Sequence, residues 1–274
     1  MTGLISVKNV DFAYRKREVL KGINLSFNHG EVVSLHGPNG SGKTTLLKII
    51  LGFLKPKKGE VFFEGQNIKK IPRNMLARRI AYVPQTHREA FAYTVEDVVL
   101  MGRMPYHSFF SSYSQKDHAA VAAALERLGI LHLMKRPYTE ISGGERQLTL
   151  IARSLAQGAD VFIMDEPVNG LDYGNQMRLL AGIKSLAREG LTIIMTTHFP
   201  DHALMTADRV ILFKDGAVLA DGPPDTTINR ETIFTLYSIQ VDIIPVNGSG
   251  KVCMPVCNQW RQGGCHVPRD HRPL

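Results

Sequence analysis

A glycine-rich segment carries the clearest chemistry in the sequence. Residues 37–44, Gly-Pro-Asn-Gly-Ser-Gly-Lys-Thr, match the pattern G-x-x-x-x-G-K-[ST] and lie between an expected strand and an expected helix. Glycines let backbone N–H groups curl around phosphate oxygens, and the start of the helix adds partial positive charge. Lys43 would bring a full charge to the β- and γ-phosphates, and Thr44 would offer a hydroxyl to Mg²⁺. The segment therefore predicts a nucleoside triphosphate site rather than a chance glycine turn.

Two adjacent carboxylates end an apolar segment further along the chain. Asp165 and Glu166 directly follow residues 161–164, which are expected to form a buried strand. Because α/β sheets bind ligands at the carboxyl ends of their strands, both acids should lie beside the phosphate loop. Asp165 would suit Mg²⁺, and Glu166 would act as a general base on the attacking water. Alone the pair could equally be a solvated turn, but with the phosphate loop it predicts phosphoryl hydrolysis.

A second possible phosphate site lies at the start of a later helix. Ser142, Gly143 and Gly144 precede Glu145 there, and a serine with two glycines at a helix N-terminus can hold phosphate. A P-loop protein needs one such site per nucleotide, so a second one suggests that two chains share each ATP. An ordinary serine N-cap with flexible glycines would look the same, and the segment by itself does not decide between them.

The elements that must position these residues alternate between strands and helices. Residue patterns predict strands over 4–12, 23–27, 31–36, 161–164, 192–196, 210–213 and 240–244. They predict helices over 44–51, 142–157, 173–189 and 230–238, and Asp215-Gly216 predicts a hairpin turn. Alternation of this kind is typical of an α/β fold with a mostly parallel sheet.

The middle of the chain has a different character. Thr94 and Ser114 each stand three residues before an aspartate, a pattern that indicates helix starts. We therefore expect a mostly helical subdomain inserted at about 88–157. From Asn247 the composition turns to Pro, Gly, Arg and Cys, so we expect one domain over 1–246 and a tail over 247–274.

Together the three motifs resemble the ABC ATPase family of P-loop NTPases over about residues 3–245. Residues 141–147 are similar to the family signature, although Ile141 stands where Leu is usual and Glu-Arg precedes Gln147. The resemblance implies a mostly parallel sheet core, an antiparallel β subdomain and an inserted helical subdomain. It also implies a head-to-tail homodimer with two ATP molecules, each between one chain's phosphate loop and the other chain's Ser142–Gly144.

The same resemblance implies functional roles for single residues. Taken without the family pattern, each of these residues would more often have a packing or structural role. Gln85 matches the Q-loop glutamine, His198 the switch histidine, and Tyr14 the aromatic residue that stacks on adenine. The implied catalytic residues are Glu166, His198 and Gln85, and the implied Mg²⁺ ligands are Thr44, Gln85 and Asp165. The implied ATP-binding residues are Tyr14, Gly37, Pro38, Asn39, Gly40, Ser41, Gly42, Lys43, Thr44, Thr45, Ser142, Gly143, Gly144 and the D-loop residue Asp172.

Composition limits the setting in which the chain works. With 44% hydrophobic and 21% charged residues, a packed core is expected. No segment has the roughly 18 consecutive apolar residues of a membrane span, and the first residues lack a signal pattern. We expect a peripheral protein on the cytoplasmic face of the membrane. The net charge of +8 raises the question of nucleic-acid binding, but no nucleic-acid motif accompanies the basic residues. A solvated basic surface is therefore the favoured interpretation, and attraction to anionic lipid headgroups is the second.

Three function classes compete within the resembled family: importer subunit, exporter subunit and soluble ATPase acting on DNA or ribosomes. The soluble class normally has a long insertion or two cassettes in one chain, and this sequence has neither. Segments 93–106 and 198–208 resemble ATPases of siderophore, haem, cobalamin and molybdate importers. Import is therefore expected, with integral membrane permease subunits and an extracytoplasmic substrate-binding protein as partners. The cargo stays open, because the permease and the binding protein recognise it.

The three cysteines of the chain all lie near its end. Cys253, Cys257 and Cys265, with His266 and His271 nearby, could hold Zn²⁺ or an iron–sulfur cluster. Their spacing is not one of the strong zinc patterns. A flexible basic tail with reduced thiols is therefore the favoured interpretation.

Overall fold

The computed structural model describes residues 3–85, 93–108, 111–246 and 250–256. Its centre is a six-stranded sheet in the order β10-β9-β3-β8-β7-β6, parallel except for β10, which pairs antiparallel with β9. The strands are β3 (Val32–His36), β6 (Ile80–Val83), β7 (Val161–Met164), β8 (Thr192–Thr197), β9 (Arg209–Lys214) and β10 (Ala217–Gly222). Every residue of β3, β7 and β8 is buried, as expected for parallel strands covered on both faces.

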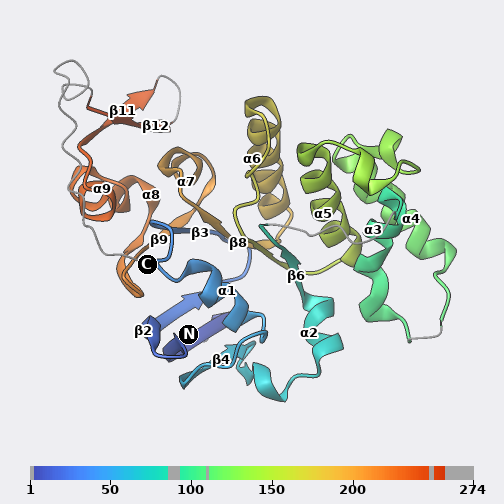
Figure 1. The fold of residues 1–274 in the computed structure, drawn as a ribbon, viewed down its shortest axis with the longest axis horizontal. Coiled ribbons are helices and arrows are strands. Elements are labelled where there is room, and N and C mark those ends of the chain that lie inside the picture. Colours follow the sequence, from blue (N-terminus) through green and yellow to red (C-terminus); the bar gives the residue numbers. More distant parts are fainter. Residues whose placement is uncertain (1–2, 86–92, 109–110, 247–249, 257–274) are drawn as a thin grey trace.

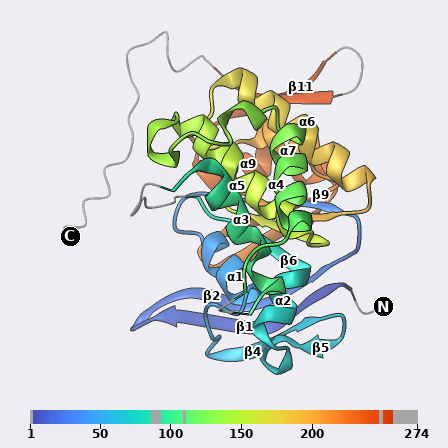
Figure 2. The ribbon, with the colours of Figure 1, turned by 90° about the vertical axis from the view of Figure 1, so that its right-hand side faces the viewer.

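A separate antiparallel sheet lies on one side of the central sheet. It consists of β1 (Ile5–Tyr14), β2 (Arg17–Phe27), β4 (Lys58–Phe63) and β5 (Gln66–Asn67), in the order β2-β1-β4-β5. Helix α1 (Lys43–Ile50) lies between the two sheets, as Figures 1 and 2 both show. One apolar cluster joins the antiparallel sheet, α1 and one face of the central sheet, so the helix that follows the phosphate loop is fixed from both sides.

Helices cover the opposite face of the central sheet. Helices α5 (Gly143–Gln157) and α6 (Tyr173–Arg188) pack against its strands, whereas α3 (Val95–Leu100) and α4 (Gln115–Arg127) pack on α5. Apolar residues of all four helices form a second cluster with β7 and β8. Helix α2 (Arg73–Arg79) leads into β6. Short 3-10 turns lie at Ile68–Lys70, Met101–Tyr106, Leu131–Leu133 and Tyr138–Glu140. Figure 1 places α3, α4 and α5 at the end of the molecule farthest from the last helix and hairpin.

The last part of the described chain forms a third cluster at the opposite end from α4. It contains α7 (Pro200–Thr206), α8 (Pro224–Thr227), α9 (Arg230–Tyr237) and a hairpin of β11 (Val241–Val246) with β12 (Gly250–Pro255). Buried residues of α7, α9, β11 and β12 pack together with β9. We call this cluster the C-terminal lobe.

The hairpin corrects the domain boundary expected at Val246. Residues 250–255 pair along their whole length with 241–246, and Cys253 is buried against the lobe. The backbone N–H of Cys253 also donates to Asp201 Oδ1 at 2.7 Å. Residues 250–255 therefore belong to the folded domain, because their ladder and their burial both depend on elements before Val246.

The predicted α/β fold with its parallel core and separate antiparallel sheet is confirmed. Most predicted elements are present with ends shifted by one or two residues, but β2 begins six residues before the predicted strand 23–27. Both expected capping boxes form, at Thr94 and at Ser114. The Asp215-Gly216 turn joins β9 to β10, with positive φ at both residues. The strands β4, β5, β6 and β12 and the helices α2, α7 and α8 were not predicted. Among the described residues, no helix is both long and apolar enough to cross a bilayer.

Candidate nucleotide site

The phosphate loop joins β3 to α1, and two of its glycines are required by close packing. Gly42 has φ 106°, and a Cβ there would lie 2.9 Å from the carbonyl oxygen of Val19. Gly37 has φ 154°, and a Cβ there would lie 2.2 Å from the carbonyl oxygen of Phe213. Since the positive φ at both positions favours glycine, no larger residue fits at either without moving a neighbouring strand. The loop is thus pressed between β2 and β9.

Lys43 is held inside this loop. Its Nζ donates to the carbonyl oxygens of Gly37 at 2.7 Å and Pro38 at 3.0 Å, and the residue is only 6% exposed. Burial lowers the pKa of the ammonium group, while the charges of Glu166 and Asp165 act in the opposite direction. The ammonium is therefore positioned where the loop backbone curls and where phosphate oxygens can replace the two carbonyls.

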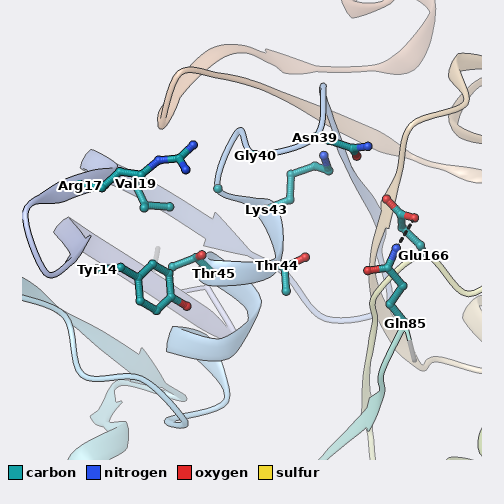
Figure 3. A pocket seen from close by; sticks show the side chains of 11 residues that line it. Tyr14, Arg17, Val19, Asn39, Gly40, Lys43, Thr44, Thr45, Gln85 and Glu166 are labelled. Carbon is teal, nitrogen blue, oxygen red and sulfur yellow. Dashed lines mark hydrogen bonds between the residues drawn. The ribbon is translucent and has the colours of Figure 1, made fainter. Parts of the chain in front are cut away.

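A pocket of about 540 Å³ opens beside the loop. Figure 3 shows Tyr14 on one side and Gln85 and Glu166 on the other, with Lys43 and Thr44 between them. Its lining comprises Tyr14, Arg17, Val19, Asn39, Gly40, Gly42, Lys43, Thr44, Thr45, Gln85 and Glu166. One pocket therefore collects predicted residues from the phosphate loop, the Q-loop position and the end of β7.

Tyr14 ends β1 at the outer side of this pocket. Its ring is 47% exposed and lies edge-on to Phe12, with 4.9 Å between ring centroids. Two neighbouring residues in the lining, Arg17 and Val19, were not predicted. The pairing of Tyr14 with Arg17 at the β1–β2 turn brings Arg17 to the pocket, and that register was the signal available to find it.

Asp165 is anchored by two hydroxyl groups. Its Oδ1 accepts from Thr196 Oγ1 at 2.7 Å and from Thr44 Oγ1 at 3.1 Å, and the residue is 2% exposed. The contact with Thr44 links the end of β7 directly to the start of α1. A hydroxyl oxygen and a carboxylate oxygen thus lie side by side at the end of the phosphate loop.

Glu166 follows in an unusual backbone conformation. Its φ of 48° lies in the left-handed region, and its N–H donates to Thr196 Oγ1 at 2.8 Å. Two side chains contact its carboxylate. Gln85 Nε2 lies 2.8 Å from Oε2, and His198 Nδ1 lies 3.4 Å from Oε1. The three residues expected to be catalytic therefore lie together, although they come from three separate segments.

Ser142–Gly144 lie elsewhere on the chain and are absent from the lining of this pocket. Ser142 caps α5, its Oγ accepting from the Glu145 N–H and its own N–H donating to Glu145 Oε2. Ser142 and Gly143 are exposed, and Asp172 caps α6 by accepting from the Asn175 N–H at 2.8 Å. A second molecule can reach these positions. Within one chain, none of them lines the pocket beside the phosphate loop.

The expected tail metal site receives no support from its described member. Cys253 lies in the apolar lobe, and burial, with the charge of Asp201, raises the pKa of its thiol to about 11. A metal would require the thiolate. The described residues contain no group of three His, Cys, Asp or Glu side chains that could hold a metal ion, and Cys257, Cys265, His266 and His271 lie outside the described residues.

Comparisons with known proteins agree with this geometry. Residues 20–169 match the model of the ABC transporter family. The petrobactin import ATP-binding protein of Bacillus anthracis is 35% identical over 88% of this chain and 89% of its own length. The hemin import ATP-binding protein of Nocardia farcinica is 35% identical over 88% of this chain and 84% of its own. An inward-facing transporter assigned to the metal-chelate type has a chain that superposes with a TM-score of 0.82 at 30% identity, covering 93% of this chain and 98% of the other.

The phosphate loop, the paired acids and the signature segment thus occur in a chain that matches 89% and 84% of the length of these two relatives. The chain belongs to the ABC transporter family, and it is one of the ATP-binding proteins of that family that hydrolyse ATP.

Proposed function

We propose that two copies of this chain dimerise head to tail and hydrolyse ATP to drive import of a metal chelate through separate membrane permease subunits. The observation that carries the proposal is the division of the site. Lys43 and Glu166 line one pocket, and Asp165 is bonded to Thr44 of its lining. Ser142–Gly144 are absent from that lining, and Ser142 and Gly143 are exposed. A second chain is therefore needed to bring a signature segment over each phosphate loop.

Mg²⁺ fits the corner formed by Thr44 and Asp165. Magnesium prefers a few hard oxygen ligands together with phosphate oxygens, and the Thr44 hydroxyl and Asp165 carboxylate supply two within 3.1 Å of each other. Gln85, which lines the same pocket, would add its amide oxygen. When bound, the ion would neutralise charge on the transferred phosphate. Lys43 would hold the β- and γ-phosphates.

Glu166 is suited to the proton transfer of hydrolysis. The attacking water loses a proton as it bonds to the γ-phosphorus, and a carboxylate beside the phosphate loop can accept that proton. Gln85 and His198 hold the two carboxylate oxygens in place. In the dimer, His198 would orient the carboxylate while the facing Ser142–Gly144 closes the site.

The helical region is the part best placed to meet a permease on the cytoplasmic face. It carries exposed large side chains at Tyr93, Met104 and Tyr106 next to α3. Gln85 precedes this region in the chain, and Arg88 and its neighbours up to residue 92 lie outside the described residues. A change at Gln85 could therefore be passed along the chain to this surface.

Cargo of the metal-chelate class is supported by the relatives, whose names give petrobactin and hemin import. The test is reconstitution of the chain with its permease subunits and an external binding protein in proteoliposomes. ATP-driven uptake of a ferric siderophore, haem or cobalamin is expected, and it should stop with Glu166→Gln. Outward transport, or ATP hydrolysis that never moves any chelate, would refute import.

Docking is tested separately by a photo-crosslinking residue placed at Met104 or at Met254. Both side chains are strongly exposed, at 59% and 50%, so each can reach a partner. Crosslinks to the permease are expected from position 104. Crosslinks from position 254 alone would place the contact on the C-terminal hairpin instead.

A further inference from the structure

A buried histidine stands directly before the phosphate loop. His36 is the last residue of β3, it precedes Gly37, and it is fully buried. Val33 and Leu35 of the same strand pack in the cluster that contains α1. Because strand side chains alternate between faces, His36 lies on the other face of the sheet, away from α1.

The partner of His36 comes from the C-terminal lobe. The hydroxyl of Tyr237 and Nε2 of His36 share a hydrogen bond of 3.1 Å, and the two rings meet nearly edge to face. Tyr237 is the last residue of α9, so the contact joins residues 201 positions apart. None of the catalytic contacts described above uses either side chain.

Because His36 directly precedes the phosphate loop, its contact with Tyr237 can affect nucleotide binding. Gly37, its neighbour in the chain, provides the nearer of the two carbonyl oxygens that hold Lys43 Nζ. Gly37 also lies close to the backbone of Phe213, because a Cβ on Gly37 would be 2.2 Å from the Phe213 carbonyl oxygen. A displacement of His36 would therefore shift the first turn of the loop and the ammonium that it holds.

The electrostatic setting requires an uncharged ring. Burial, together with the positive charges of Lys43 and His198, lowers the pKa of His36 to about 3, against a smaller opposing effect of the Thr197 backbone. A neutral imidazole accepts or donates one hydrogen bond at Nε2 without adding charge beside Lys43. Tyr237 meets that need, because its own pKa is raised by burial and by the charge of Glu166.

We propose that His36 and Tyr237 form a positioning pair through which the C-terminal lobe sets the geometry of the phosphate loop. The pair acts on ATP affinity, and neither residue touches the nucleotide. Movement of α9 or of the hairpin that packs with it is then transmitted to the ATP site through one hydrogen bond. The inference depends on nucleotide binding alone, so it stands or falls separately from the cargo and the permease.

The test compares two contacts that hold α9 to the sheet. Tyr237→Phe removes the hydrogen bond to His36, whereas Lys214→Met removes the bond from Lys214 Nζ to the carbonyl oxygen of Thr235, 2.7 Å long. Each variant loses one partly buried hydrogen bond of α9, so both should lower the melting temperature. Calorimetric titration of the purified chain with Mg-ADP, well below melting, then measures the dissociation constant.

Tyr237→Phe is expected to weaken Mg-ADP binding about fivefold, the factor that corresponds to loss of one partly buried hydrogen bond of about 1 kcal/mol. The KM for ATP should rise by a similar factor with little change in kcat, as for a lost binding contribution. Lys214→Met should stay within about twofold of the parent chain. Equal affinities in the parent and Tyr237→Phe, or equal weakening by both variants, would overturn the proposal.

A double-mutant cycle identifies the partner. His36→Leu removes the same hydrogen bond from the other side, so Tyr237→Phe added to it should weaken binding little further. If the two effects on the dissociation constant multiply instead, Tyr237 does not act through His36.

Discussion

The side-chain amide of Gln85 donates a hydrogen bond of 2.8 Å to Oε2 of Glu166. Glu166 comes from the end of β7, whereas Gln85 follows β6 and stands immediately before the segment that leads into the helical region. A water that uses Oε2 as its base must compete with this amide. The bond therefore connects the state of the base with the position of the Q-loop segment.

Removing the ammonium of Lys43 should abolish turnover. Lys43→Ala deletes the only side-chain cation that lies inside the phosphate loop among the described residues that line the pocket. Loss of one charge that stabilises a phosphoryl transition state costs roughly 100-fold or more. The measurement is phosphate release by the purified variant, with Lys48→Ala, on the same helix but outside the lining, as the control. Hydrolysis at the parent rate would contradict the assignment of the phosphate loop.

Replacing the base by its amide should separate binding from hydrolysis. Glu166→Gln keeps the size of the side chain and can still bond to Gln85, but it cannot accept the proton of the attacking water. Turnover should fall by about 100-fold to 10,000-fold, while the affinity for ATP changes little. Size-exclusion chromatography with Mg-ATP should then show a stable dimer. A monomer with parent turnover would remove Glu166 from the mechanism.

The shared site can be tested by complementation. Ser142→Arg should block dimer closure and turnover, because the bulky side chain occupies the exposed cap of α5, yet ATP should still bind to the intact phosphate loop. Mixing Ser142→Arg with Lys43→Ala places one unaltered composite site in each mixed dimer. Partial activity is expected in the mixture and none in either variant alone. Unchanged ATP-dependent dimerisation of Ser142→Arg would argue against a site built from two chains.

Contiguous motifs made the central part of the site predictable from sequence. The phosphate loop, Asp165 with Glu166, and Ser142–Gly144 each place their chemistry at a strand or helix end that the residue pattern already indicates. Gln85 and His198 have no such local signal and were found through family resemblance. The structure brings both to Glu166 because β6, β7 and β8 are adjacent in the parallel sheet.

Features that depend on pairing between distant segments were missed. Strand β12 is short, ends in proline and gains its burial only by pairing with β11, so nothing local marks it. The contact between His36 and Tyr237 joins the end of β3 to the end of α9, and no residue pattern links these two positions. Arg17 differs from these two features, because it pairs with the nearby Tyr14 across the β1–β2 turn and was missed although Tyr14 itself was predicted.

Arg17 should contribute to nucleotide affinity. Figure 3 shows its guanidinium beside Gly40 at the edge of the pocket, and a Cβ on Gly40 would lie 4.0 Å from Nη2 of Arg17. A cation there attracts the phosphate chain, but it is exposed and screened, so about 1 kcal/mol is expected, or roughly fivefold in KM. Arg17→Ala should raise KM with kcat nearly constant, more at low salt than at high salt.

The matched control for this charge is Lys16→Ala. Lys16 is exposed in the same turn and does not line the pocket. Its loss changes the net charge equally and should leave KM within about twofold of the parent value. An equal rise in KM for both variants would show that only the overall charge of the turn matters.

His36 should not titrate between pH 8 and pH 5 in the folded chain, since burial lowers its pKa to about 3. The chain has ten histidines, so the ring signals are assigned by comparing the ¹³C-histidine NMR spectra of the parent and His36→Asn. The unfolded chain protonates this residue near pH 6.5, where the folded chain does not. The unfolded chain therefore binds more protons than the folded chain between about pH 3 and 6.5, so lowering the pH through this range favours unfolding.

The same difference predicts a pH-dependent effect on stability. The contribution of His36 to the free energy of unfolding should fall by about 1 kcal/mol between pH 6.5 and 5.5, and by about 1.4 kcal/mol per pH unit below that, because one additional proton binds on unfolding. Asparagine cannot take up that proton, so His36→Asn should lose stability less steeply from pH 6.5 to 5.5 in urea unfolding experiments. The variant is expected to be less stable than the parent at pH 7.5, where it has lost packing, and the gap should narrow in acid. A gap that stays constant, or a ring signal that titrates near pH 6.5, would mean that His36 is open to protonation beside Lys43.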